Sequence, residues 1–431
     1  MQERRAFSRV CGFRARPSRA PTGIGNRAPR AAVPAYAAPP MATVEDRAAS
    51  HDLYDLTDEH RAMRQMVRQM AQERVAPRAA EIDEKAEYPQ DIRRLFAEHD
   101  LLGLPFSEEH GGTGADMVML MIAIEEVAAA CASSSLILAV QDLGSLPIRL
   151  FGTDEQKSRW LPKLASGEWA PAFALSEPEA GSDPGGMRTR AVRDGDEWVI
   201  NGQKNWITNL GVADFYCVFA VTDSEQGHSR GISCFVVPSD TPGLSIGKPE
   251  HKMGIRGSPT GSPSFEDCRV PAENLIGEEN RGFRVAMATL DRSRLGVAAQ
   301  ALGIAQGATD YAVAYAKERR QFGKPISELQ AIQFKIADME TGNAAGRELL
   351  YKAAAKVDRV EADMGKYSAM AKLFCGDHAM RTTVEAVQVL GGYGYVKEYP
   401  VERMMRDAKI TQIYEGTQEI QRLVVSRATL R

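Results

Sequence analysis

The sequence predicts an α+β protein in which a helical segment, a small β module and a second helical segment follow one another along 431 residues. Three observations predict this order. Apolar residues recur at helical spacing up to about Trp169, short segments rich in β-branched and aromatic residues follow Pro171, and long Ala-rich stretches begin at Gly282. At roughly 150 residues per domain, the length suggests two to three domains. We expect an N-terminal extension over residues 1–52, a helical domain over 53–170, a β domain over 171–280 and a helical domain over 281–431.

The first 40 residues form a region of their own, rich in Arg, Ala and Pro, with Glu3 as the only acidic residue. This composition is typical of a cleaved organellar transit peptide, and it is also expected if translation starts downstream, at Met41. In both cases the repeated prolines prevent a long helix, so we expect this segment to be disordered.

The composition disfavours several classes of protein. The formal net charge of −4 favours neither a nucleic-acid partner nor an anionic membrane surface. The six cysteines form no CxxC pair, which argues for a reducing compartment and against a thiolate zinc site. The seven histidines are dispersed, so we expect no metal. The longest apolar run, 117–140, contains Glu125 and Glu126 and predicts a buried helix rather than a membrane span.

Start signals define two helices of the first segment. Thr57 precedes a run whose apolar residues fall at helical spacing, and Thr153 precedes the run that carries Trp160 and Leu161. A threonine side chain at such a position accepts a hydrogen bond from the first turn of a helix. We therefore expect both threonines to be helix caps.

The β module contains short strands separated by turn residues. DFYCVFAV, GISCFVV and PSFEDCRV have strand composition, and the Asn201-Gly202 pair predicts a hairpin turn. KNWITN is also expected to be a strand, which would place Trp206 and Thr208 on one face. The last helical segment is broken at RRQFGKP, DRVEADMG and VLGGYGYVKEYP.

Three motifs carry the functional signal. They are FALSEPEAGSDPGG from Phe173, KNWITN from Lys204, and IYEGTQEIQR from Ile413. Together they resemble the acyl-CoA dehydrogenase family, and the resemblance covers Leu53 to Arg431. It implies an N-terminal α domain, a middle β domain, a C-terminal four-helix bundle and FAD as cofactor. The rest of the chain resembles bacterial, actinobacterial-type members, which favours the downstream start and a cytoplasmic location over the mitochondrial matrix.

Glu415 is the candidate base. A carboxylate that removes an α-proton must be ionised yet basic, and burial would raise its pKa from ~4.3 towards ~6–7. Gly416 allows the backbone to approach a substrate. The resemblance implies that Glu415 takes the α-proton of an acyl thioester while FAD takes the β-hydride, and that its backbone N–H donates to the thioester carbonyl. An isolated YEGT sequence would be only a helix-start loop.

The family also has members whose base lies on an earlier helix, in a DLER-type sequence. The matching segment here is DRSR, and Ser293 occupies the position of that glutamate. The resemblance therefore places this chain in the branch with the late glutamate. Asp291 and Arg294 lie at family positions that contact substrate, although Asp-x-x-Arg is also a common helix-surface pair.

The resemblance further implies contacts with FAD and acyl-CoA. Ser182 would reach the acyl-CoA, and Trp206 and Thr208 would cover the flavin and bond near N5, unless Trp206 is simply core of the β module. Arg319 offers a planar fork of donors that suits phosphate. Several contacts come from a neighbouring subunit in the family, so we expect a homotetramer. The expected FAD contacts are Phe173, Leu175, Ser176, Trp206, Thr208, Arg319, Phe322, Gln330, Gln388, Val389, Leu390, Gly391, Gly392, Thr417, Gln418 and Glu419.

The expected reaction is dehydrogenation of a short- to medium-chain acyl-CoA, with electrons passed to an electron-transfer flavoprotein. Two alternatives stay open: a flavin oxidase on the same fold that reduces O₂, and an inactive member that acts as an assembly scaffold. A hydrolase built on GLSIG at Gly243 is remote, because that segment lacks the strand–turn–helix context of a nucleophile elbow. GIGNRA at Gly23 has no strand before it, which argues against a dinucleotide fingerprint.

Overall fold

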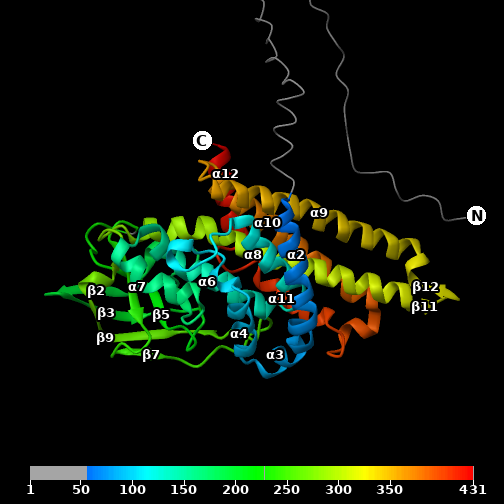
Figure 1. Cartoon of the computed structure of the whole chain (residues 1–431), viewed down its shortest axis with the longest axis horizontal. Helices are drawn as coiled ribbons and strands as arrows, with labels where there is room; N and C mark the ends of the chain where they lie inside the picture. The colour runs from blue at the N-terminus through cyan, green and yellow to red at the C-terminus, as the bar shows by residue number, and fades with distance from the viewer. Residues whose placement is uncertain (1–55, 228, 431) are drawn as a thin grey trace, which may run out of the picture. The chain divides into compact units, whose positions relative to one another are not determined.

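The computed structural model describes residues 56–430 with the exception of residue 228. The predictions for residues 1–52, including the extension, its disorder and GIGNRA, lie outside the described residues. The first part of the described chain is helical (Figure 1). Its helices are α2 (Asp58–Met70), α3 (Ala79–Lys85), α4 (Gln90–Glu98), α5 (Met117–Ala130), α6 (Ala132–Phe151) and α7 (Asp154–Ala165).

Both predicted caps are confirmed. The Thr57 side chain accepts from the His60 backbone N–H at the start of α2, and the Thr153 side chain accepts from Gln156 at the start of α7. The apolar run over 117–140 is not one helix but two, because Cys131 adopts extended dihedral angles between α5 and α6. Among the described residues, no helix combines the length and the apolar character needed to cross a membrane.

An eight-stranded sheet forms the middle of the chain, with strand order β10-β6-β5-β2-β3-β9-β7 and with β1 paired to β5. β4 and β8 pair separately. Side chains of β5 alternate between two cores: Phe215, Cys217 and Phe219 face one, and Tyr216 and Val218 face the other. Burial on both faces explains its near-continuous apolar sequence. The strands are β1 (Pro171–Ala174), β2 (Arg190–Asp194), β3 (Glu197–Gln203), β4 (Ile207–Thr208), β5 (Phe215–Val221), β6 (Ile232–Pro238), β7 (Leu244–Ile246), β8 (Thr260–Gly261), β9 (Pro263–Pro271) and β10 (Leu275–Ile276).

The predicted hairpin turn at Asn201-Gly202 is wrong. β3 runs through this pair with a change of register against β9, and the turn lies at Gly195, between β2 and β3. Gly202 is required for another reason, since a Cβ there would lie 2.5 Å from Thr189 Oγ1. The Asn201 amide donates to Asp267, which fixes the irregularity. Close approach of backbones is a frequent reason for glycine within a strand.

The prediction that KNWITN is one strand is also wrong. Only Ile207–Thr208 is a strand, and Trp206 has a φ of +61°. Strand alternation therefore does not apply from Trp206 to Thr208. The buried side chain of Lys204 and the backbone of Asn205 form hydrogen bonds with the segment 175–177. These contacts replace the backbone hydrogen bonds of a strand.

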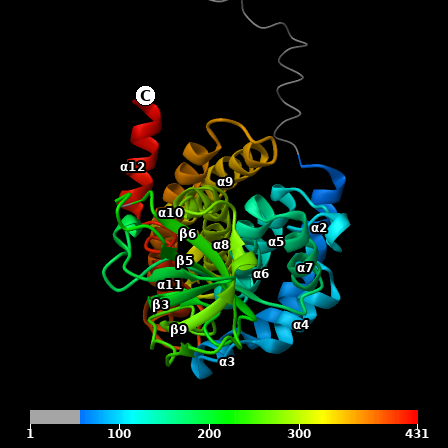
Figure 2. The same cartoon turned by 90° about the vertical axis from the view of Figure 1, so that its left-hand side faces the viewer.

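The last part of the chain is helical, and its breaks fall where the sequence predicted them. The helices are α8 (Gly282–Glu318), α9 (Gln330–Asp358), α10 (Met364–Leu390), α11 (Val401–Ile410) and α12 (Gln418–Thr429), with a hairpin of β11 (Arg320–Gln321) and β12 (Lys324–Pro325) after α8. α8 packs against α5, α6, α9 and α10. Gly303 and Gly307 permit the contact with α5, because a Cβ at either would lie 2.2 Å from an α5 carbonyl oxygen. Figure 2 shows the sheet beside the helices α5, α6 and α7.

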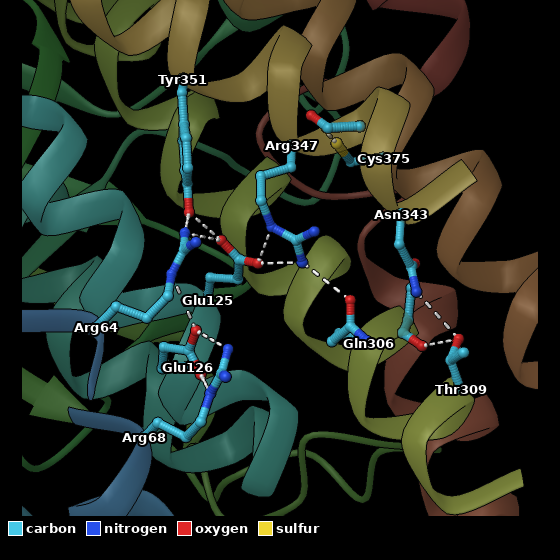
Figure 3. A network of polar contacts seen from close by, with 12 residues as sticks. Arg64, Arg68, Glu125, Glu126, Gln306, Thr309, Asn343, Arg347, Tyr351 and Cys375 are labelled. Carbon is cyan, nitrogen blue, oxygen red and sulfur yellow. Dashed lines mark hydrogen bonds and ion pairs between the residues drawn. The ribbon is translucent and has the colours of Figure 1, made fainter. Parts of the chain in front are cut away.

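An ion-pair network around the buried carboxylates of Glu125 and Glu126 joins α2, α5, α8 and α9 (Figure 3). Glu125, with a side chain 3% exposed, accepts from Arg347 Nε at 2.8 Å and from the Tyr351 hydroxyl. Glu126 accepts from Arg68 through both oxygens at 2.9 and 2.8 Å. Arg64 lies between the two glutamates. The predicted α+β fold with helical, β and helical domains is confirmed.

Candidate active site

Glu415 lies on a short loop between α11 and α12. Its backbone φ is +51°, and that of Gly416 is +92°. A non-glycine residue in the left-handed region costs about 1–2 kcal/mol, and such a conformation persists only when the surroundings fix it. Thr417 ends the loop by accepting the Ile420 N–H as the cap of α12. The backbone thus turns sharply at the candidate base.

Side chains from two helices hold this turn. The Ser293 hydroxyl, on α8, donates to Glu415 Oε2 at 2.5 Å. The resemblance implies that other members of the family carry their base at the position of Ser293, and the structure places this position in contact with Glu415. From α12, the Gln421 amide donates to the carbonyl oxygens of Glu415 at 3.1 Å and of Gly416 at 2.8 Å.

Lys372 is a residue that the sequence analysis missed. It lies on α10, is fully buried, and donates to the Gly416 carbonyl at 2.7 Å and to Gln418 Oε1 at 3.1 Å. Burial lowers its pKa to about 8, although the charge of Glu415 opposes this shift. The available signal was a single lysine among the small residues of YSAMAKLFCG, a position at which a cation requires a buried partner.

Burial raises the pKa of Glu415 to about 7. The Ser293 hydrogen bond and the positive charges of Arg294 and Lys372 oppose this shift, whereas Asp142 adds to it. Among the described residues, no basic side chain forms a direct ion pair with Glu415. Asp142 is itself buried, and it binds Arg149 at 2.6 Å. The carboxyl group can therefore change protonation state near neutral pH.

Asp291 and Arg294 form an ion pair of 2.8 Å one turn apart on α8. The arginine side chain is only 5% exposed, whereas the aspartate is 37% exposed. Arg294 Nε is buried without a hydrogen-bond partner among the described residues. The pair is therefore not a surface pair, and the buried arginine lies on the same helix as Ser293.

The structure brings the segments around Leu175 and Trp206 together. Lys204 is fully buried and donates to the Leu175 carbonyl at 3.1 Å and to Glu177 Oε1 at 2.8 Å, and the Asn205 N–H donates to the Ser176 carbonyl at 2.9 Å. Burial lowers the pKa of Lys204 to about 8. The sequence analysis missed this lysine and Glu177, which fix the two predicted flavin segments against each other.

The predicted cofactor residues of this region differ in exposure. Trp206 is 60% exposed, Phe173 packs edge-on against Phe219, and Leu175 is buried. Ser182 lies in the exposed bend after Ala180, and Thr208 is half-buried on β4. A large exposed aromatic side chain at such a position is available to a ligand or a partner.

A cavity of about 580 Å³ lies where α8, α9 and α10 end or begin. It falls within the range of about 300–1,000 Å³ that is usual for ligand sites. Phe322, 89% exposed, contributes to its wall, and the Arg319 guanidinium lies 5.4 Å from the Tyr393 ring centre. The predicted residues that line it are Arg319, Phe322, Val389, Leu390, Gly391 and Gly392.

The remaining predicted residues lie outside this lining. Gln330 and Gln388 are exposed on neighbouring turns. Thr417 caps α12, and Gln418 and Glu419 begin this helix next to the candidate base. Both amide protons of Gln418 are donated within the chain, to the Leu373 carbonyl and to Asp377. A contact of the Gln418 side chain with FAD would therefore compete with these bonds.

The two candidate regions for FAD are far apart within one chain. Leu290, near the start of α8, packs against the same hydrophobic cluster that contains Leu175, whereas Arg319 directly follows the end of α8. At about 1.5 Å of rise per residue, the helix between these points spans roughly 40 Å. In Figure 1 the sheet and the β11–β12 hairpin accordingly lie at opposite ends of the long helices.

Models of three domains match the chain in order. They are acyl-CoA dehydrogenase, N-terminal domain, over residues 57–168; the middle domain over 172–268; and the C-terminal domain over 280–430. The chain is 51% identical over 382 residues to a probable acyl-CoA dehydrogenase, FadE25, of Mycobacterium tuberculosis, covering 89% of this chain and 98% of the relative. It is 48% identical to a short-chain-specific acyl-CoA dehydrogenase of Clostridium acetobutylicum, covering 88% and 100%.

Solved structures agree with these matches. Butyryl-CoA dehydrogenase of Megasphaera elsdenii superposes with a TM-score of 0.85 at 45% identity, covering 88% of this chain and 100% of that one. A chain from a study of the electron transferring flavoprotein of Acidaminococcus fermentans gives 0.86 at 45%, covering 88% and 99%. An acyl-CoA dehydrogenase of Bacillus anthracis complexed with FAD gives 0.82 at 34%, covering 88% and 68%.

The chain belongs to the acyl-CoA dehydrogenase family. It is an oxidoreductase of this family, and its cofactor is FAD. The residues present fit that cofactor, because the cavity offers an arginine for phosphate and an aromatic wall beside the exposed glycines Gly391 and Gly392.

Proposed function

We propose that the protein converts a short- to medium-chain acyl-CoA to the trans-2-enoyl-CoA, with Glu415 as the base. The observation that carries this proposal is a half-buried carboxyl group, held by Ser293 and lacking a direct ion pair, whose pKa desolvation raises to about 7. A base is most efficient when its pKa lies near the working pH. Glu415 takes the pro-R α-proton, and FAD, when bound, supplies the acceptor for the β-hydride.

The chain's own residues prepare this step. The backbone N–H of Glu415, in the left-handed turn with Gly416, is proposed to donate to the thioester carbonyl, where it would stabilise enolate charge as an oxyanion hole does. Arg294 supplies nearby positive charge, and Ser182 and Asp291 are proposed to contact the acyl-CoA. The segments of Leu175 and Trp206 hold the flavin, and the cavity of Arg319 holds the adenine half.

We infer that the enzyme is a homotetramer in which subunits share FAD. One dinucleotide cannot span the roughly 40 Å between the flavin segments and Arg319 along α8, so each cavity would complete a site on a neighbouring subunit. The exposure of Phe322 and Trp206, 89% and 60%, supports this arrangement because both side chains would gain a covering ligand or partner.

The proposed electron acceptor is an electron-transfer flavoprotein, the usual partner of the family. The similarity to a chain from the structural study of the Acidaminococcus electron transferring flavoprotein supports this proposal. The short-chain and butyryl-CoA relatives support short, straight acyl chains and a role in fatty acid β-oxidation. Bacterial relatives and the unpaired, buried cysteines of the described residues support a bacterial cytoplasmic location.

An anaerobic absorbance titration with butyryl-CoA tests the proposal. The oxidised flavin band near ~450 nm should bleach in the wild type and persist in Glu415→Gln, because proton removal commits the hydride transfer. Bleaching in both proteins would exclude Glu415 as the base. A flavin that no straight, branched or aromatic acyl-CoA reduces would contradict the dehydrogenase. Rapid reoxidation by O₂ without a flavoprotein acceptor would instead indicate an oxidase.

A further inference from the structure

The loop of Glu415 has an unusual backbone that needs support from outside it. Two consecutive residues, Glu415 and Gly416, have positive φ. Only the second is a glycine, so the conformation at Glu415 is strained and must be fixed by its contacts. Gln421 belongs to the helix that the loop begins, and it therefore moves with the loop. Support from a separate element comes from Ser293 and from Lys372.

Lys372 is the support that also carries charge. Its ammonium group binds the Gly416 carbonyl at 2.7 Å and the Gln418 side chain at 3.1 Å, so it spans both sides of the cap residue Thr417. Gln418 is in turn anchored on α10 through the Leu373 carbonyl and Asp377. The loop is thus attached to α10 at successive points, and the lysine binds its backbone rather than its carboxylate.

We propose that Lys372 is a positioning residue for the base: it fixes the turn at Glu415 and Gly416 and places a positive charge beside the Glu415 carboxylate without forming an ion pair with it. This inference rests on the proposed function of Glu415. A direct ion pair would hold the carboxylate ionised but weakly basic, whereas a cation bound to the next carbonyl moderates the effect of burial. The arrangement leaves the carboxylate free for the α-proton.

Other charged groups face the same region, and each favours or opposes the ionised form of Glu415 or of Lys372. Arg294 of α8 also favours the ionised form of Glu415, and Asp142 of α6 opposes it. Asp377 of α10 and Glu419 of α12 favour the charged form of Lys372, and Arg294 opposes it. Lys372 is the member of this group that binds the backbone of the loop. Removing its charge should therefore make the base harder to ionise.

The test compares three substitutions of Lys372 in the holoenzyme. Lys372→Met removes both the charge and the donors, Lys372→Gln keeps a donor for the Gly416 carbonyl, and Lys372→Arg keeps the charge. Lys366→Met is the control, because Lys366 lies on the same helix and makes none of these contacts. The measurement is the rate of anaerobic flavin reduction by subsaturating butyryl-CoA as a function of pH.

We expect the acid limb of the profile to move to higher pH by about one unit in Lys372→Met and Lys372→Gln. Lys372→Arg should keep the wild-type limb, and Lys366→Met should match the wild type. A wild-type limb in Lys372→Gln, or an equal displacement in Lys366→Met, would overturn the proposal. A purely structural role would lower the amount of folded protein without moving the limb.

A second readout separates this inference from the proposed function. The ¹³C carboxyl signal of Glu415, identified by its loss in Glu415→Gln, is titrated without any substrate. A higher pKa in Lys372→Gln than in the wild type supports the role of Lys372 even if butyryl-CoA reduces no flavin, the outcome that would count against the proposed substrate. An unchanged pKa overturns the role of Lys372 even if the enzyme is fully active.

Discussion

Glu125 and Glu415 both lie in the helical part of the chain, but Glu125 is buried, Glu415 is half-buried, and their partners differ. Glu125 binds Arg347 at 2.7 Å, lies 3.6 Å from Arg64 and accepts from the Tyr351 hydroxyl (Figure 3). Glu415 accepts from one neutral hydroxyl, that of Ser293. Charge compensation makes the first glutamate a structural link between helices. Incomplete charge compensation leaves the second, the proposed base, with a pKa raised to about 7.

This difference predicts opposite costs for the same substitution. Desolvation without a paired cation destabilises the ionised carboxyl of Glu415 in the folded state. The free energy of unfolding is therefore lower than it would be with a neutral side chain, and the proposed base stays reactive. Around Glu125, ion pairs and hydrogen bonds already offset the free-energy cost of removing the carboxylate from water. Removal of one partner there leaves another charge buried and unpaired.

The largest expected effect concerns the rate of Glu415→Gln. Because the amide cannot accept the α-proton, flavin reduction by butyryl-CoA should slow by at least ~10²–10⁴-fold, the usual contribution of a general base. Stopped-flow absorbance under anaerobic conditions measures this rate. FAD content should stay at the wild-type level, which serves as the control. A loss smaller than tenfold would remove Glu415 from the mechanism.

Glu125→Gln should instead damage the fold. It leaves Arg347 without its carboxylate and removes one of the two carboxylates beside Arg64. Breaking a buried pair from one side costs about 3–5 kcal/mol. Thermal unfolding of the holoenzyme would report a lower Tm. The protein that remains folded should reduce flavin at close to the normal rate. An unchanged Tm would show that the network contributes little.

Glu415→Gln should have the opposite effect on stability. The folded-state pKa of about 7 exceeds the ordinary glutamate value of 4.5, so the folded state binds the proton more tightly and the wild type loses stability as pH rises between these values. The substitution should stabilise the substrate-free protein by about 1–3 kcal/mol at pH 8. The gain should vanish near pH 4. Unfolding curves at both pH values measure it, and destabilisation at pH 8 would contradict the account.

Ser293→Ala should give the smallest effect. Its hydroxyl donates to the ionised carboxylate and lowers the pKa of Glu415. Without it, the acid limb of flavin reduction should move to higher pH by about one unit, the size of one hydrogen bond to a charged group. The same pH series on Thr289→Ala, one turn earlier on α8, is the control. A limb that moves to lower pH would reverse the assigned sign.

Local signals in the sequence predicted local structure well. Thr57 and Thr153 cap their helices because a cap depends on residues within one turn. The prediction of a turn at Asn201-Gly202 was wrong, because the glycine is needed for the close approach of Thr189 and not for a reversal of the chain. The prediction that KNWITN is a strand was wrong, because Lys204 forms hydrogen bonds with Leu175 and Glu177, which are distant in sequence.

In the candidate site, too, some residues could be predicted from the sequence, whereas others depend on contacts between distant segments. The resemblance placed six predicted cofactor residues that the structure gathers around one cavity. It did not identify Lys372, whose partner Gly416 lies 44 residues away along the chain. The lone lysine in YSAMAKLFCG signals a buried cation, but its partner depends on how α10 packs against the loop, and no local pattern in the sequence encodes that packing. The DRSR segment did single out Ser293, and the structure places its hydroxyl 2.5 Å from Glu415 Oε2.

The most direct test of the contrast between the two glutamates is the pH dependence of wild-type flavin reduction at subsaturating butyryl-CoA, which reports groups of the free enzyme. Because Glu415 must be ionised, the rate should fall about tenfold for each pH unit below a limb near pH 7. A limb near 4.5, the ordinary value for a glutamate, or a rate independent of pH down to that value, would contradict the claim that incomplete charge compensation creates the base.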